Sequence, residues 1–188
     1  PHIPNNIEIK KFWVNQGFIE VMHNSFMTKK NGETLENLVQ IDNPMNSNQF
    51  YLRNSLIPDL VNLYRKYAKY GWQCDKVFEL GHTFDNKKQH SKLACAWLPK
   101  LANWDEKPVS FFDAKSEVET FLKFAKINYD SQENILNGCA WIQQNNNSKE
   151  EVCRLIHVNR EFKINIKQDI FICEINLDYI NNDTTTIQ

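Results

Sequence analysis

The chain has 188 residues, enough for one ordinary domain, and its 22 Lys and Arg against 23 Asp and Glu give a formal net charge of −1. It therefore carries no overall basic field that would hold a polyanion. Its 5 glycines stand far apart, which excludes a Walker A loop and a G-x-G-x-x-G turn, and no apolar run approaches the ~18 residues of a membrane helix.

The cysteines argue against a disulfide framework or a zinc site. Their number is odd, 5 in all, and no two form a C-x-x-C pair. With no signal peptide in the sequence, this pattern predicts reduced, mostly buried thiols in a cytoplasmic protein. The histidines also lack metal-ligand spacing, so we expect no bound metal. The lack of a long apolar run predicts no membrane partner. The chain opens at Pro1 without an initiator Met, as an excerpt of a longer protein would.

The first third of the chain predicts one helix followed by short strands. One helical face is formed by Ile9, Phe12, Trp13 and Gln16. Gly17 is suited to end this helix, and residues 18–22 then alternate like a strand. Residues 38–41 are typical of a second short strand, and the following Asn43-Pro44 pair predicts a turn that stops it.

The middle of the chain predicts a long helix and two strands. Ser55 is placed to cap a helix that begins at about Leu56, and apolar residues recur at helical spacing until Gly71 ends the pattern. We then expect strands over residues 76–84 and from Ser91 to Leu98.

The last third adds a helix, a hairpin and two strands. The helix has one apolar face, made by Val118, Phe121, Leu122 and Ala125. Asn137-Gly138 predicts a hairpin turn, and residues 143–148 a polar loop. Strands are expected over residues 154–158 and 170–177, and the second is apolar enough to lie centrally in a sheet. Three helices and six or more strands, in no strict β-α-β order, predict an α+β fold with a mainly antiparallel sheet.

One segment is specific enough to suggest a family. Residues 43–63 read N-P-M-N-S-N-Q-F-Y-L-R-N-S-L-I-P-D-L-V-N-L, and residues 78–85 read F-E-L-G-H-T-F-D. This closely resembles the β subunit of phenylalanyl-tRNA synthetases, whose pattern there is NPL-S, LR-SLLPGLL and then FE-G-VF. Further similar motifs follow that subunit's order, at residues 17–21, 24–26, 109–115, 154–157 and 174–177. The resemblance covers nearly the whole chain.

The resemblance implies a particular module of that subunit. We expect residues 1–180 to be its catalytic-like core, with a class II aminoacyl-tRNA synthetase-like fold whose sheet is flanked by helices. Residues 181–188 would be a polar tail or linker toward a missing C-terminal domain. The family enzyme attaches phenylalanine to tRNA(Phe) with ATP and Mg²⁺. Its active site lies in the α subunit, which would be the partner of this module, and bacterial forms are usually α₂β₂.

The residues give a chemical check on catalysis. Class II active sites use an Arg on the strand pair after the helix, because its planar fork matches phosphate oxygens. In the family's α subunit this Arg closes a G-R-V-Y-R run, and here the corresponding residue is Asp85, which would repel a phosphate. Residues 170–177 also lack the late glycines and Arg that class II enzymes place over adenine. We therefore predict no catalytic residues and no cofactor bound by this chain.

Structural roles are expected for four residues and a contact role for two. We predict a structural ion pair between Arg53 and Glu79, and a structural turn at Asn43 and Pro44. Class II synthetases pair subunits through a helix and strand near the start of the domain, so Phe12 and Trp13 are expected at the subunit interface, with burial in the chain's own core as the alternative.

Two other functions remain open at this stage. An active stand-alone class II ligase would need a phosphate-binding Arg near Asp85, and a diverged nucleic-acid-binding module would need a basic patch. Arg65, Lys66 and Lys69 form one small patch, either a solvated helix face or a tRNA contact. The chain departs from the family pattern at Ser116 and Val158, where the family has Gly and Pro.

Overall fold

The computed structural model describes residues 3–27, 38–44, 51–70, 74–85, 88–98, 109–145, 148–161 and 169–181. Within these ranges the helices are α1 (Asn6–Asn15), α2 (Ile57–Tyr70), α3 (Phe111–Phe124), the short α4 (Val158–Glu161) and the 3₁₀ helix η1 (Leu177–Asn181). None of these described helices is long and apolar enough to cross a membrane.

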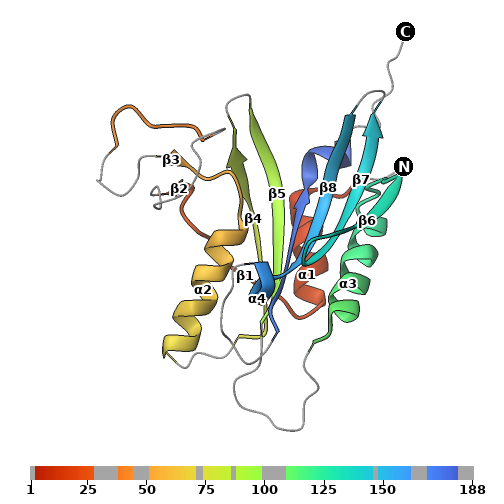
Figure 1. The fold of residues 1–188 in the computed structure, drawn as a ribbon, viewed down its shortest axis with the longest axis horizontal. Helices are drawn as coiled ribbons and strands as arrows, with labels where there is room; N and C mark the ends of the chain where they lie inside the picture. The colour runs from red at the N-terminus through yellow and green to blue at the C-terminus, as the bar shows by residue number, and fades with distance from the viewer. Residues whose placement is uncertain are drawn as a thin grey trace.

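A seven-stranded sheet forms the centre of the molecule, in the order β1-β4-β5-β9-β8-β7-β6 (Figure 1). Its strands are β1 (Ile19–Glu20), β4 (Lys76–Phe84), β5 (Gln89–Trp97), β6 (Ser131–Ile135), β7 (Gly138–Asn145), β8 (Ser148–His157) and β9 (Phe171–Asn176). Only the β1–β4 pair is parallel, and the other five pairs are antiparallel. A separate ribbon joins β2 (Phe26–Met27) to β3 (Tyr51–Leu52). The α+β class with a mainly antiparallel sheet is confirmed.

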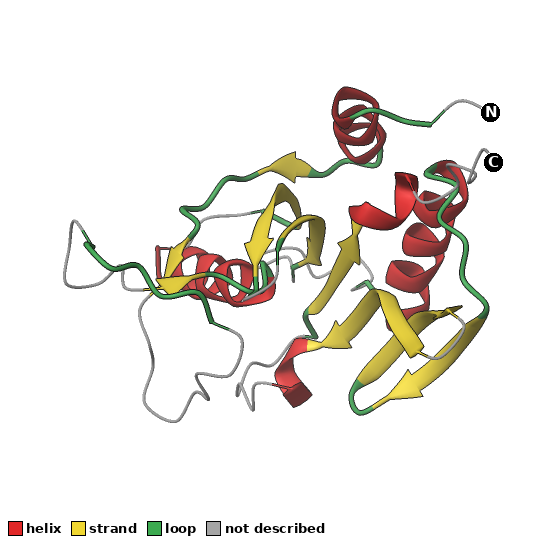
Figure 2. Cartoon of the chain, turned by 90° about the horizontal axis from the view of Figure 1, so that it is seen from above, coloured by secondary structure: helices red, strands yellow, loops and turns green. Residues whose placement is uncertain are grey.

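The helices cover opposite faces of this sheet (Figures 1 and 2). Apolar residues of α1 and α3 share one buried cluster with the side chains of β4, β5, β9, β8 and β7 that point their way. Apolar residues of α2 form a second cluster with the alternate residues of β4, β5, β8 and β9. Because side chains alternate along a strand, each central strand supplies both layers. This explains why β9 has apolar residues on both faces, at every position except Glu174 and Asn176.

Local sequence signals define where α1 and α3 begin and where α1 ends. Asn5 and Glu8 form a reciprocal capping box at the start of α1, and Ser110 with Asp113 does the same for α3. After α1 the chain turns at Gly17, whose φ of +84° lies in the left-handed region that favours glycine. The start of α1 and the turn at Gly17 together direct the chain into β1, at one edge of the sheet.

Most predicted elements are confirmed. The helix after Ser55, the strand over residues 76–84 and the hairpin turn at Asn137-Gly138 all lie where the sequence placed them, within two residues. β9 is the fourth of the seven strands, so its central position is confirmed. The end of the long helix at Gly71 lies outside the described residues.

Two strand predictions and one loop prediction are wrong. Residues 38–41 form no strand, since only Gln40 makes a single bridge to Tyr51. The strand over residues 18–22 is reduced to Ile19–Glu20. The polar loop over residues 143–148 belongs mostly to strands, because β7 extends to Asn145 and β8 begins at Ser148. Cross-strand pairing overrides the weak strand propensity of these polar residues.

Candidate functional site

A buried ionic network lies where β4 meets the start of α2. Arg53, at the entry to α2, places its Nη1 2.8 Å from Glu79 Oε1 of β4 and 3.0 Å from Asp59 Oδ2 of α2. Its Nε donates to the backbone carbonyl of His82 at 3.1 Å. The side chains of Arg53 and Glu79 are 5% and 1% exposed. The network therefore ties the segment before α2 to the middle of the sheet.

Glu79 is also bound from a third segment. The backbone N–H of His23 donates to Glu79 Oε1 at 3.2 Å, and His23 Nδ1 lies 2.6 Å from Glu79 Oε2. Burial raises the pKa of Glu79, but the hydrogen bonds from His23 and Arg53 outweigh it, so the pKa lies below its ordinary value. Glu79 is thus held as a carboxylate and is a poor candidate for a general acid or base.

Gly81 makes room for the guanidinium of Arg53. A Cβ atom on Gly81 would lie 2.5 Å from Arg53 Nη2 and 3.4 Å from Glu79 Oε1. The absence of a side chain at this position is therefore a packing requirement of the Arg53–Glu79 pair.

A second carboxylate from β9 occupies the start of α2. Glu174 Oε1 accepts hydrogen bonds from Ser55 Oγ at 2.9 Å and from the backbone N–H of Leu56 at 2.7 Å, and its Oε2 lies 2.9 Å from Lys92 Nζ. The N-terminus of a helix attracts anions, and here the protein's own carboxylate already satisfies it. The sequence signal was a charged residue within an apolar central strand, but its partners could not be inferred.

A third acidic cluster closes the far end of the β4–β5 hairpin. Asp85 Oδ2 lies 2.9 Å from His90 Nε2, and Asp178 Oδ2 lies 2.8 Å from His90 Nδ1. The backbone N–H of Ser91 donates to Asp178 Oδ1 at 3.1 Å. Burial raises the pKa of Asp178, but the hydrogen bonds from Ser91 and His90 outweigh it and the pKa lies below its ordinary value. Asp85 is thus engaged in a structural contact.

The sheet face beside α2 does not fit the phosphates of ATP. Its described cations are already engaged by carboxylates, Arg53 by Glu79, Lys92 by Glu174 and Arg154 by Glu151. A polyanion placed there would meet carboxylates without a free cation to balance it. Across the described ranges there is also no group of three or more His, Cys, Asp or Glu that could hold a metal ion.

The predicted interface residues lie in different environments. Trp13 is 0% exposed and packs against Phe18, Trp97 and Phe121 in the core of this chain. The expectation that Trp13 contacts a partner is therefore corrected, because no part of its ring reaches the surface. Phe12 is half-buried and stacks on Phe124 with ring centroids 4.8 Å apart. An interface role for Phe12 stays a prediction.

The predicted turn residues lie apart from the ionic network. Asn43 is exposed and lies in a bend, and Pro44 is half-buried at the end of a described range. Among the described residues, no hydrogen bond or ion pair joins either residue to Arg53 or Glu79. Their structural role stays a prediction.

Several large apolar side chains are exposed along α1, β1 and the residues that follow β1. In the backbone, α1 and β1 follow one edge of the molecule (Figure 2). We call this the α1–β1 surface and include in it Met22, two residues after β1. Its large apolar members are Ile7, Val14, Ile19 and Met22, which are 64%, 55%, 58% and 83% exposed. A 2.6 Å ion pair between Lys10 and Glu20 connects the two elements. β1 is the last strand of the sheet, so its outer backbone edge is free for pairing within the described chain.

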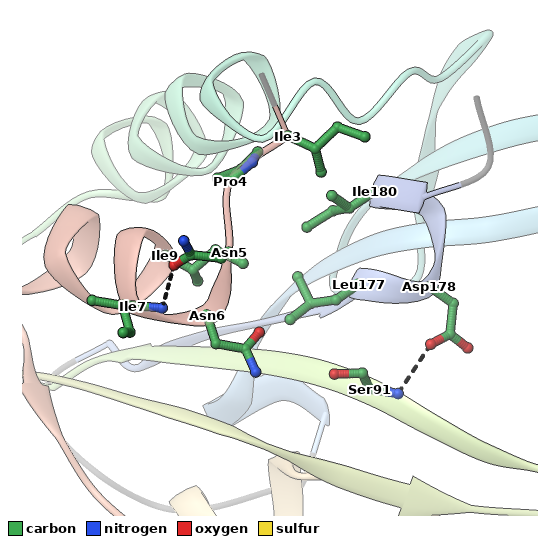
Figure 3. Close-up of a pocket in the computed structure, with 10 residues that line it drawn as sticks. All are labelled: Ile3, Pro4, Asn5, Asn6, Ile7, Ile9, Ser91, Leu177, Asp178 and Ile180. Atoms are coloured by element: carbon green, nitrogen blue, oxygen red, sulfur yellow. Dashed lines mark hydrogen bonds between the residues drawn. The ribbon is translucent and has the colours of Figure 1, made fainter. Parts of the chain in front are cut away.

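Two open cavities lie on the described surface. The first, of about 610 Å³, lies between the start of α1, Ser91 of β5 and η1 (Figure 3). Its charged group, Asp178, is engaged by Ser91 and His90. The second, of about 490 Å³, lies beside the start of α3 and contains His157, whose Nε2 is 2.7 Å from Asp169 Oδ1. Neither cavity contains a residue of the Arg53–Glu79 network.

Comparison with known proteins identifies the family. The family model described as the phenylalanyl tRNA synthetase beta chain CLM domain matches residues 5–177. The chain belongs to this family. A relative named phenylalanine–tRNA ligase beta subunit from Francisella tularensis is 31% identical over 89% of the chain, and one from Onion yellows phytoplasma is 29% identical over 95%. The chain spans 23% of the length of each, so it corresponds to one part of those subunits.

Solved synthetases share the fold. A pyrrolysyl-tRNA synthetase from Desulfitobacterium hafniense superposes with a TM-score of 0.64 at 17% identity, over 95% of this chain and 68% of that one. A prolyl-tRNA synthetase from Giardia lamblia, in complex with prolyl-adenylate, gives 0.65 at 7% identity, over 92% of this chain and 43% of that one. The CLM domain thus has the class II synthetase-like fold expected from the sequence.

Proposed function

We propose that this CLM domain is a non-catalytic structural module of a phenylalanyl-tRNA synthetase β chain. It packs on the catalytic α subunit of an enzyme that attaches phenylalanine to tRNA(Phe), using ATP and Mg²⁺ bound elsewhere. The observation that carries the proposal is the internal neutralisation of the face beside α2, where each described cation is already paired with a carboxylate. The role also implies a cytoplasmic location.

The α1–β1 surface is the best candidate for the contact with the α subunit. It combines exposed apolar side chains, which are stabilised when a partner removes them from water, with a free strand edge. Trp13 and Phe12 support this surface from beneath, since they fix α1 on the sheet and on α3. Phe12 is the one of the two that retains some exposed area.

The test compares two pairs of charge-introducing substitutions in the full-length β chain, co-expressed with a tagged α subunit. Ile19→Asp with Met22→Asp places two charges on the α1–β1 surface. Phe112→Asp with Leu136→Asp is the matched control, because these side chains are at least as exposed as Ile19 and Met22, at 77% and 84% against 58% and 83%, but lie on α3 and the β6–β7 turn. We expect only the first pair to abolish co-purification, while both variants keep the circular dichroism spectrum of the wild type.

Two results would contradict this proposal. If the α subunit retains both variants equally, the α1–β1 surface is not the contact with α. Saturable binding of ATP to the isolated β chain, measured by calorimetry, would favour instead a class II synthetase-like paralogue that binds an amino acid or tRNA on its own.

A further inference from the structure

The outer face of α2 carries three cations that have no ionic partner among the residues that the structure describes. Arg65, Lys66 and Lys69 are exposed, and the one polar contact among them is from Arg65 Nη1 to Asn62 Oδ1 at 3.5 Å. By contrast, carboxylates pair with Lys10, Arg53, Lys76, Lys88, Lys92, Lys115, Lys149 and Arg154. The protein thus neutralises many of its cations internally, but not these neighbours.

The three cations lie on one side of the helix. At about 3.6 residues per turn, Arg65, Lys69 and Lys66 fall within an arc of about 100°, with Lys69 in its middle. The buried residues Leu60 and Tyr64 face the sheet on the other side. The positive groups therefore all point away from the body of the protein, and Arg65 and Lys69 are about 6 Å apart along the helix axis.

This arrangement is unfavourable for an isolated helix. Arg65 and Lys69 are like charges at positions i and i+4, which repel each other. The helix dipole favours Lys69 in the last turn, but it does not favour Arg65 in the middle of α2. The only carboxylate on α2, Asp59, lies in the first turn and is engaged by Arg53. An external anion would relieve the repulsion, and nothing on the helix does.

An aromatic ring stands beside the cations. Tyr70 is 60% exposed, and Lys69 Nζ lies 5.4 Å from its ring centroid. Lysines and arginines next to an exposed ring are the combination with which proteins hold a nucleic-acid strand, since the cations bind phosphates and the ring stacks on a base or packs on a sugar. We define the α2 cationic face as Arg65, Lys66, Lys69 and Tyr70.

We propose that the α2 cationic face contacts the phosphate backbone of the tRNA that the parent enzyme charges. This inference rests on the proposed function for the identity of the RNA, and on the charge pattern of α2 for the contact itself. The chain as a whole has a net charge of −1, so the attraction is local to this helix face. The contact would position the RNA without reading its sequence.

The experiment uses the full α and β complex and a transcript of its tRNA(Phe). The test variant is Arg65→Gln/Lys66→Gln/Lys69→Gln. The control variant is Arg160→Gln/Lys123→Gln/Lys126→Gln, which also removes one exposed arginine and two exposed lysines, none of which has an ion pair within the described part of the chain. Fluorescence anisotropy measures the Kd for tRNA over a range of KCl concentrations. Each phosphate contact contributes about 0.7–0.9 to the slope of log Kd against log salt.

For the test variant we expect the slope to fall by about 2–3 and the Kd at about 0.1 M KCl to rise about tenfold or more, with the control within about twofold of wild type. Equal weakening of both variants would show a bulk charge effect and overturn the proposal, as would an unchanged slope in the test variant. Co-purification with α and phenylalanine-dependent ATP–pyrophosphate exchange are measured in parallel. If α does not bind wild-type β, the proposed function fails, and the same titration with the β chain alone still decides the α2 contact.

Discussion

Replacement of Arg53 by Met should destabilise the protein strongly, because it leaves Glu79 buried and deprived of its cation. Both side chains are almost fully buried, so solvent does not screen the pair. Breaking one side of such a pair costs about 3–5 kcal/mol. With a urea dependence of about 2 kcal/mol/M, the midpoint of unfolding should fall by about 1.5–2.5 M. Urea unfolding, followed by the fluorescence of the buried tryptophans, measures this shift.

The control is Lys149→Met, which breaks an exposed pair of nearly the same length. Lys149 Nζ lies 2.7 Å from Glu133 Oε1, but the two side chains are 63% and 43% exposed. Exposed pairs of this kind contribute about 0.2–1 kcal/mol. The two single substitutions thus separate the effect of burial from that of contact distance.

A double variant tests whether the cost comes from the unpaired charge. In Arg53→Met/Glu79→Gln both charges are absent, and the Gln amide can still accept the backbone N–H of His23. We expect the double variant to be more stable than Arg53→Met alone, with a coupling of about 1–3 kcal/mol relative to additive single effects. Additive costs, or a loss below about 1 kcal/mol in Arg53→Met, would refute the reasoning.

Three other predictions concern pH, backbone packing and thiols. The pKa of Glu79 is lowered in the folded state, so the unfolded state takes up the proton first as the pH falls below about 5, and stability decreases on acidification. Urea midpoints measured from pH 7 to 3 should show this decrease, and Glu79→Gln should make it smaller. Gly138→Ala would bring a Cβ to 2.0 Å from the backbone oxygen of Leu155, and we expect a loss of about 1–3 kcal/mol or more in thermal unfolding. Burial raises the pKa of the Cys139 thiol to about 11 and also raises the pKa of Cys74, but Cys74 is the one cysteine that is not fully buried. A disulfide reagent at pH 8 should therefore react first with Cys74, and Cys74→Ser should remove that fast phase. A second fast thiol in Cys74→Ser would contradict this last prediction.

The sequence predicts those elements whose signal is local. The helical spacing after Ser55, the apolar face from Val118 to Ala125, and the glycine at Asn137-Gly138 specify their structures without reference to the rest of the chain. The length of β7 and β8 is different, because their polar ends are held by cross-strand partners such as Gln144 and Lys149. Periodicity cannot show such pairing, and the loop prediction failed for this reason.

The candidate site shows the same division. Arg53 and Glu79 each lie in one of the two motifs that resemble the family pattern. The sequence therefore predicted their ion pair, and the structure contains it. Glu174 was visible as a polar residue in an apolar strand, but its partner Ser55 is 119 residues away. Trp13 shows a further limit, because an apolar helix face has the same chemistry whether it packs on its own sheet or on another chain.

We expect the paired charges to give the face beside α2 a structural role in place of nucleotide binding. Sites that bind ATP must keep cations unpaired in a partly buried cleft, which is costly until the ligand arrives. Here Glu79 and Glu174 engage Arg53 and Lys92 instead, and the carboxylates also hold the start of α2 against the sheet. The polar residues of this face thus fix the helix, and the groups left over for intermolecular contact are those outside it, the α1–β1 surface and the outer side of α2.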